Sequence, residues 1–196
     1  MPAYLLPSPD GLPWLTLLVL SPLIGIALVG LSAALRLSER SVRLGVLAWT
    51  LLTLGIALYV WAGFDYGAVA AGQGAFQFAE RVPWISAIRV NYFLAIDGLS
   101  LPLVLLTAVM MPVAAFASWG VAERVRAHYA LLLLLEAAML GYFVALDFFF
   151  IFIFWEFSLV PAFLLIQLWG RENRRDAALK FFIYTMAGSL GLLLLF

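Results

Sequence analysis

One long apolar segment sets the first limit on how this chain can fold. Between Asp147 and Arg171 the only ionisable residue is Glu156, and the rest of FFFIFIFWEFSLVPAFLLIQLWG is almost entirely hydrophobic. A helix needs about 20 apolar residues, each rising roughly 1.5 Å, to cross a bilayer. The segment therefore predicts a transmembrane helix with a carboxyl group near its middle.

Further apolar stretches predict an all-α integral membrane protein with about six transmembrane helices. Hydrophobic residues make up 66% of the chain and charged residues 11%, which also argues against a nucleic-acid partner. The 42 residues from His128 to Trp169 would reach about 63 Å as one helix, so the chain must turn back, and Asp147 is expected to cap the next helix. The expected helices lie near residues 13–35, 44–63, 99–119, 128–146, 148–169 and 177–196.

The basic residues indicate how these helices are oriented. Nine of the eleven lie at the first, third and fifth connections or at the adjoining helix ends, and only Arg81 and Arg89 lie on the other side. The positive-inside rule therefore places the N-terminus outside and these three loops in the cytoplasm. The nine are Arg36, Arg40, Arg43, Arg124, Arg126, Arg171, Arg174, Arg175 and Lys180.

The segment 64–98 divides the chain into three parts. Residues 1–63 hold two expected helices, 64–98 an outer loop, and 99–196 four helices that carry the membrane carboxyls. Alternating apolar residues near 76–82 and 88–96 suggest two short extended segments, which predict a strand pair on the outer face. The alternative is an irregular loop whose aromatic residues lie in the membrane interface.

Glu156 is the leading candidate for a functional residue. An acidic side chain at a helix centre costs roughly 2.5–3.5 kcal/mol on insertion scales, so it must find a partner, reach water or take up a proton. Pro161, one turn further on, removes a backbone hydrogen bond and favours a kink near the carboxyl group. The alternative is a protonated glutamic acid that only forms a hydrogen bond to a neighbouring helix.

Glu136 and Lys180 are the other candidates within the apolar runs. If the chain reverses at Asp147, Glu136 and Glu156 lie at a similar depth on adjacent antiparallel helices, where two carboxyls would suit a proton relay. The alternative for Glu136 is a hydrogen bond between closely packed helices. Lys180 begins the last expected helix, where extending its ammonium to the cytoplasmic surface is favoured over a role in a proton pathway.

Other kinds of site lack the residues that they need. One His and no Cys are too few for a haem, zinc or iron–sulfur site. No Gly-rich phosphate loop follows a strand. Redox or nucleotide chemistry is therefore expected in other subunits, with no cofactor and no metal bound by this chain.

Four segments resemble the antiporter-like M subunit of respiratory complex I, the bacterial counterpart of the mitochondrial ND4 subunit. They are FQFAERVPWI, LAIDGLSLPLVLLT, LLLLEAAMLGYFVALDFFFIFIFWEFSLVPAFLLIQLWG and RDAALKFFIYTMAGSLGLLL. The resemblance runs from about Phe76 to the end. The FWE tripeptide with its downstream proline, and KFFIYTMAGS, point to M more than to the related L and N subunits.

The resemblance implies proton translocation coupled to NADH oxidation by quinone, in a multi-pass protein of the cell inner (plasma) membrane. Family members have about fourteen helices, so this chain would be the N-terminal part, with L-like and N-like subunits as partners. NADH, FMN, iron–sulfur clusters and quinone would bind to other subunits. The family's fifth-helix glutamate pairs with a seventh-helix lysine; FWE places that role on Glu156, and Glu136 matches an acidic position of the fourth helix.

Three alternatives to this function remain open at this stage, and so does the question of whether the chain is complete. A related multisubunit Na+/H+ antiporter or a membrane-bound hydrogenase shares these helices, and a purely structural membrane scaffold would use both glutamates as static hydrogen-bonding groups. The last residues, LGLLLLF, lie inside an apolar run with no polar exit. We therefore expect the chain to be a portion of something longer, or to be completed by another chain.

Overall fold

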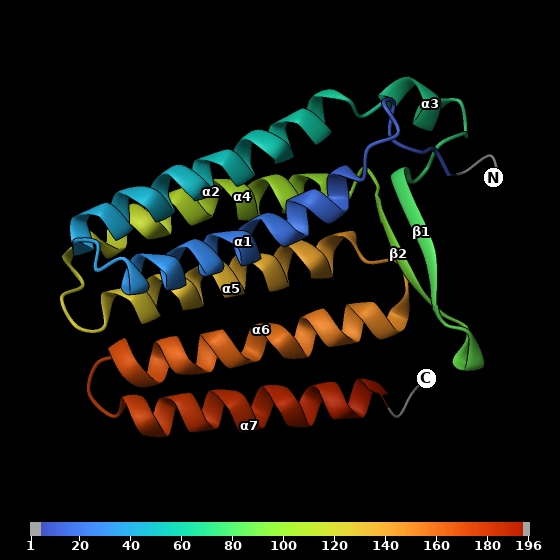
Figure 1. Cartoon of the computed structure of the whole chain (residues 1–196). Coiled ribbons are helices and arrows are strands. Elements are labelled where there is room, and N and C mark those ends of the chain that lie inside the picture. The colour runs from blue at the N-terminus through green and yellow to red at the C-terminus, as the bar shows by residue number, and fades with distance from the viewer. Residues whose placement is uncertain (1–4, 194–196) are drawn as a thin grey trace.

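The structure, a computed structural model, describes residues 5–193 and contains six long helices that run up and down in alternation (Figure 1). Helix α5 lies at the centre, against α1 and α4 on one side and α6 on the other, while α7 packs on the far side of α6. The long helices are α1 (Trp14–Ala34), α2 (Glu39–Ala62), α4 (Ser100–Ala117), α5 (Val125–Val144), α6 (Phe148–Trp169) and α7 (Arg174–Leu193).

The chain has the helices of a multi-pass integral membrane protein, as expected. Five of them, α1, α2, α4 with the turn that follows it, α5 and α6, are long and apolar enough to cross a bilayer. Helix α7 is not among the five, and its first two turns carry four charged residues. Its span stays a prediction, and the end of the expected sixth helix, residues 194–196, lies outside the described residues. All three basic connections lie at one end of the bundle (Figure 1). Following the predicted orientation, we call this end the cytoplasmic end and the opposite end the outer end.

The predicted strand pair is confirmed, and its location on the outer face of the membrane stays a prediction. Strands β1 (Gln77–Ile85) and β2 (Val90–Ile96) form an antiparallel hairpin in which Arg81 faces Phe93. Strand β1 continues through Pro83, with a register shift just after it. The same segment also contains a short helix, α3 (Tyr66–Ala70), capped by Asp65, which the alternating pattern did not predict.

Two carboxylates fasten this hairpin to the outer ends of helices. Glu80 of β1 accepts hydrogen bonds from Leu15 N at 2.7 Å and Thr16 N at 3.1 Å, at the start of α1, and from the Thr16 hydroxyl. Asp147 accepts from Asn91 N of β2 at 2.9 Å and from Phe149 N at 3.0 Å. The predicted cap of α6 by Asp147 is therefore confirmed, and the same carboxylate joins α6 to the hairpin.

Helix boundaries differ from the expected ones at charged ends. Helix α2 begins at Glu39 instead of near 44, because the Ser38 hydroxyl caps the helix by accepting from Ser41 N at 3.2 Å. Helices α5 and α7 likewise begin three residues earlier than expected, with arginines in their first turns. Apolar content predicts the part of a helix inside the bilayer, whereas capping decides where the helix starts.

Candidate functional site

Glu136 is the most completely enclosed carboxyl group that the structure describes. It is 0% exposed, and neither carboxyl oxygen has a hydrogen-bond partner among residues 5–193. Tyr129, Leu133 and Leu140 lie on the same side of α5, within roughly 60° at 100° per residue. The Tyr129 hydroxyl donates to Ala115 O of α4 at 3.1 Å, so Glu136 faces the interior of the bundle.

Buried hydroxyls lie at the same depth in the surrounding helices. Ser21 of α1 bonds to Thr53 of α2, with 2.7 Å between the hydroxyl oxygens, and Thr107 of α4 donates to the carbonyl of Leu103. These three residues and Glu136 stand seven to nine residues from the outer ends of their helices, or about 10–14 Å. Buried hydroxyls and the Glu136 carboxyl therefore share one depth in the bundle, and we call the three hydroxyl residues the hydroxyl layer.

Glu156 lies on a more open helix. Its side chain is partly exposed, yet Oε1 is buried with no hydrogen-bond partner in the described part of the chain. Phe163, two turns on and within roughly 20° of the same face, contacts Phe182 of α7 at 5.4 Å between ring centroids. Glu156 therefore lies on the side of α6 that faces α7. Helix α6 continues unbroken through Pro161 to Trp169.

The two glutamates share a depth but not a direction. Each stands eight residues from the reversal between α5 and α6, or about 12 Å, as predicted. The helices meet where Phe154 of α6 lies over Gly141 of α5. Glu136 is turned roughly 140° from Gly141 and Glu156 roughly 160° from Phe154, so both carboxyls face away from this contact. A proton relay between Glu136 and Glu156 therefore needs further proton-carrying groups that connect the two carboxyls around α6.

Lys180 lies at a different level from both glutamates. It is six residues into α7 from the cytoplasmic end, or about 9 Å, whereas Glu156 is 13 residues from that end, or about 20 Å. Its side chain is 69% exposed, and Nζ is 3.8 Å from the carboxylate of Asp176, whose side chain is 77% exposed. This geometry favours the surface role, and participation of Lys180 in a proton path stays a prediction.

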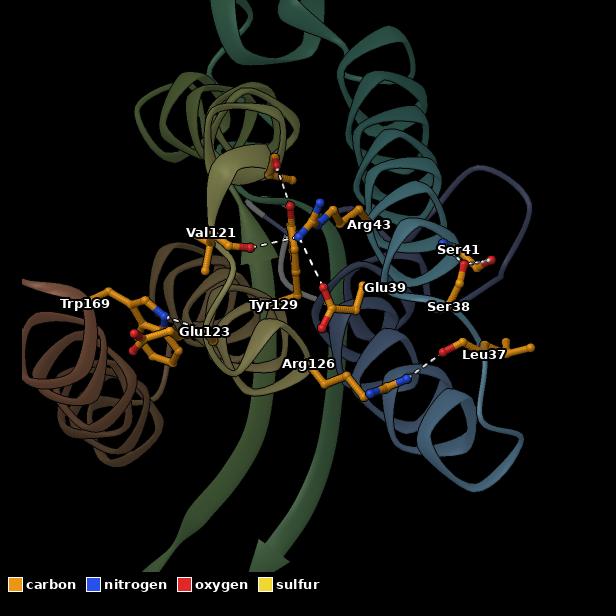
Figure 2. Close-up of polar contacts among 11 residues, drawn as sticks. Leu37, Ser38, Glu39, Ser41, Arg43, Val121, Glu123, Arg126, Tyr129 and Trp169 are labelled. Atoms are coloured by element: carbon orange, nitrogen blue, oxygen red, sulfur yellow. Dashed lines mark hydrogen bonds and ion pairs between the residues drawn. The ribbon is translucent and has the colours of Figure 1, made fainter.

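Hydrogen bonds between arginines and backbone carbonyls hold the cytoplasmic end together (Figure 2). Arg43 of α2 donates to Val121 O at 2.9 Å, and Arg126 of α5 donates to Leu37 O at 2.6 Å. The indole of Trp169 at the end of α6 donates to Glu123 O at 3.0 Å. Each of these bonds joins a helix to a connection between two other elements, so together they tie the helices to one another at this end of the bundle.

Sequence reasoning missed the hydroxyl layer and the indole that supports it. Trp49 of α2 donates to the backbone carbonyl of Ser21 at 2.6 Å, beside the Ser21–Thr53 pair. Single Ser and Thr residues are common in apolar helices, where they bond to their own backbone, so nothing marks those that meet across an interface. Among residues 5–193, no three His, Asp or Glu side chains are grouped as a metal ion would require.

The chain is similar to known proteins over most of its length. The family model described as NADH:quinone oxidoreductase/Mrp antiporter, transmembrane, matches residues 145–196. An NAD(P)H-quinone oxidoreductase chain 4 of Thermosynechococcus vestitus is 41% identical over 93% of this chain and 33% of its own length. Subunit M of the F420H2 dehydrogenase of Methanosarcina mazei is 42% identical over 93% of this chain and 35% of its own length.

A solved structure agrees with these relatives. One chain of respiratory complex I from Thermus thermophilus with bound NADH aligns with a TM-score of 0.74 and 28% identity, over 91% of this chain and 34% of that chain. The sequence given spans about a third of the length of the proteins that it matches. The resemblance drawn from the sequence is confirmed: this chain is homologous to chain 4 of NAD(P)H-quinone oxidoreductases and to subunit M of the F420H2 dehydrogenase.

Proposed function

We propose that this chain is part of a membrane-arm subunit that moves protons across the cell's inner (plasma) membrane, coupled to NADH oxidation by quinone. The observation that carries the proposal is Glu136, a fully enclosed carboxyl with no hydrogen-bond partner in residues 5–193, at the same depth as the buried oxygen of Glu156. Burying a carboxyl without a partner costs free energy, and a role in proton transfer explains why the chain keeps it there. Such a carboxyl exchanges a proton only when water or a basic group reaches it.

The relatives support a role in ion movement more than a role in electron transfer. Chain 4 of an NAD(P)H-quinone oxidoreductase and subunit M of an F420H2 dehydrogenase are nearly equally similar to this chain, although their names state different electron donors. The donor is therefore set elsewhere in each enzyme. In our proposal NADH, FMN, iron–sulfur clusters and quinone bind to other subunits, and L-like and N-like subunits lie beside this one.

Glu156 is assigned the principal role and Glu136 a supporting one. Glu156 faces α7, toward the part of a longer subunit where the family's basic partner is expected. Glu136, enclosed by α1, α2 and α4, would pass protons within the hydroxyl layer when water enters. Both side chains act as proton-path residues, while electron transfer takes place in other subunits.

Glutamine substitutions in the complete enzyme test this proposal. Glu156→Gln keeps the size of the side chain but cannot ionise, so the pH gradient formed during donor oxidation should be largely lost, and Glu156→Asp should restore part of it. Glu136→Gln should lower the gradient as well. Glu172→Gln, in the exposed loop between α6 and α7, is the control and should pump normally.

Measured amounts of assembled enzyme separate proton transfer from structure. If the Gln variants assemble normally and pump like the wild type, the two carboxyls have no part in translocation and the scaffold reading holds. The family model also covers Mrp antiporters, so pumping should be measured with and without Na+. A gradient that requires Na+ would favour the antiporter reading over the proposed one.

A further inference from the structure

Helices α1 and α2 enclose an apolar groove that the proposed function does not use. Its volume is about 230 Å³, and it lies in the cytoplasmic half of the bundle, away from both glutamates. The α1 side chains along it are large and face outward, with Leu28, Leu31 and Leu35 45%, 52% and 60% exposed. Residues that line it include Gly25, Leu28, Leu31, Leu35, Gly45 and Trp49.

Two glycines and one tryptophan give the groove its form. A Cβ added at Gly45 would meet no atom within 4 Å, so the missing side chain there leaves open space. At Gly25 a Cβ would come within 2.7 Å of the Trp49 ring, so only glycine lets the indole lie against α1. The Trp49 N–H donates a hydrogen bond to Ser21 O at 2.6 Å, which fixes the ring at the end of the groove nearer the membrane centre.

The length of the groove matches one leaflet of a bilayer. From Gly25 in α1 to Leu35 at its C-cap the lining rises by ten residue steps, or about 15 Å. The hydrocarbon core of a bilayer is about 30 Å thick, so one leaflet is about 15 Å. The groove therefore runs from near the membrane centre to the cytoplasmic surface, which is the path of one acyl chain of the inner leaflet.

The cytoplasmic mouth of the groove is polar and cationic. Ser41 and Leu37 line this end, and Figure 2 shows Arg126 donating to Leu37 O beside Ser38 and Ser41. Arg36, between two lining leucines, and Arg40 are exposed, and the guanidinium of neither forms an ion pair or hydrogen bond within residues 5–193.

The backbone holds Arg36 in an unusual conformation. Its φ is 51°, at the position after α1 where glycine is preferred, with Leu37 N bonded to Ser32 O at 2.9 Å and Arg36 N to Ala33 O at 3.1 Å. A side chain at this position is strained relative to glycine. The end of α1 thus carries an arginine at a position where glycine would adopt the left-handed backbone conformation with less strain.

We propose that this groove binds one acyl chain of an anionic phospholipid from the cytoplasmic leaflet, with its phosphate held by Arg36 and Arg40. The apolar lining, the one-leaflet length and the free guanidiniums at the mouth together select a ligand that is apolar along its length and negative at one end. The inference depends on the membrane setting and not on proton transfer by the glutamates.

Photolabelling of the complete enzyme in its membrane tests the proposal. The probe is phosphatidylglycerol with a diazirine in its acyl chain, and labelled residues are mapped by mass spectrometry. Labels are expected on α1 and α2 along the groove. Gly45→Leu should fill the groove and lower this labelling several-fold. Gly55→Leu, on the same helix and also in open space, is the matched control and should leave labelling unchanged.

The headgroup is tested by exchanging lipid and charge. Labelling by the matching phosphatidylcholine probe should be weaker, and Arg36→Gln with Arg40→Gln should reduce phosphatidylglycerol labelling to that level. Arg171→Gln with Arg175→Gln removes the same charge from another loop and should have no effect. Equal labelling in Gly45→Leu and Gly55→Leu, equal labelling by both lipids, or labels only on a neighbouring subunit would each overturn the proposal.

Discussion

The contact between Gly141 and Phe154 gives a prediction whose magnitude can be worked out from the structure. A Cβ added at Gly141 would come within 2.6 Å of Phe154 Cζ and closer still to two other ring carbons. Phe154 cannot move away easily, because its ring also packs against Phe150 at 6.2 Å between centroids. Gly141→Ala should therefore push α5 and α6 apart.

Two opposing contributions decide the size of the effect. Overpacking of a well-packed contact costs about 1–3 kcal/mol, and replacing glycine by alanine inside a helix gains up to about 1 kcal/mol. Gly30→Ala in α1 is the control, since a Cβ there meets no atom within 4 Å and only the gain applies. Gly141→Ala should therefore be less stable than Gly30→Ala by about 1–3 kcal/mol.

Thermal unfolding of the purified protein in detergent measures this difference. The Gly141→Ala midpoint should fall below that of Gly30→Ala, and adding Phe154→Leu should recover much of the loss because the smaller side chain leaves room for the methyl group. An increase in the midpoint of Gly141→Ala equal to that of Gly30→Ala would refute the close contact between α5 and α6 at this level.

Two further predictions concern the outer hairpin and the orientation. Burial raises the pKa of Glu80 above its ordinary value, against its hydrogen bonds to Thr16 and Leu15, so folded protein binds the proton more tightly than unfolded protein. The stability that Glu80 contributes is therefore full below its ordinary pKa and is lost as the pH rises through its raised pKa. Over that rise the free energy of unfolding should fall more for the wild-type protein than for Glu80→Gln. Parallel pH profiles of the two proteins would contradict this prediction. The chain has no Cys, so single cysteines at Ser86 and Asn173 should react with an impermeant maleimide from outside and from the cytoplasm, respectively, and reaction of both from one side would disprove the orientation.

The membrane architecture could be predicted because the bilayer imposes a simple length and polarity rule. Apolar runs gave the positions of all six long helices, and the short spacing around Asp147 gave the reversal between α5 and α6. The ends were less accurate, since α2 starts at a Ser38 cap within a charged stretch. Alternation along 76–96 gave the hairpin, but not its attachment through Glu80 and Asp147, which joins residues far apart in sequence.

The candidate site was only partly predictable. Depth follows from counting residues along a helix, so the equal level of Glu136 and Glu156 could be expected from the sequence. The direction in which each side chain points depends on which helix packs on which face. This packing turns Glu136 and Glu156 away from each other, so that α6 lies between the two carboxyls. The enclosure of Glu136 by three earlier helices, and the lipid groove opened by Gly45, likewise arise only from tertiary packing.

The central claim is that Glu156 and Glu136 exchange protons during turnover. Infrared difference spectroscopy of the complete enzyme measures this directly, because a carboxyl that gains or loses a proton changes its C=O stretching absorption. We predict carboxyl bands on addition of donor and quinone that disappear in part in Glu156→Gln and in part in Glu136→Gln, and that persist in Glu172→Gln. Spectra identical to wild type in both membrane variants would contradict the account.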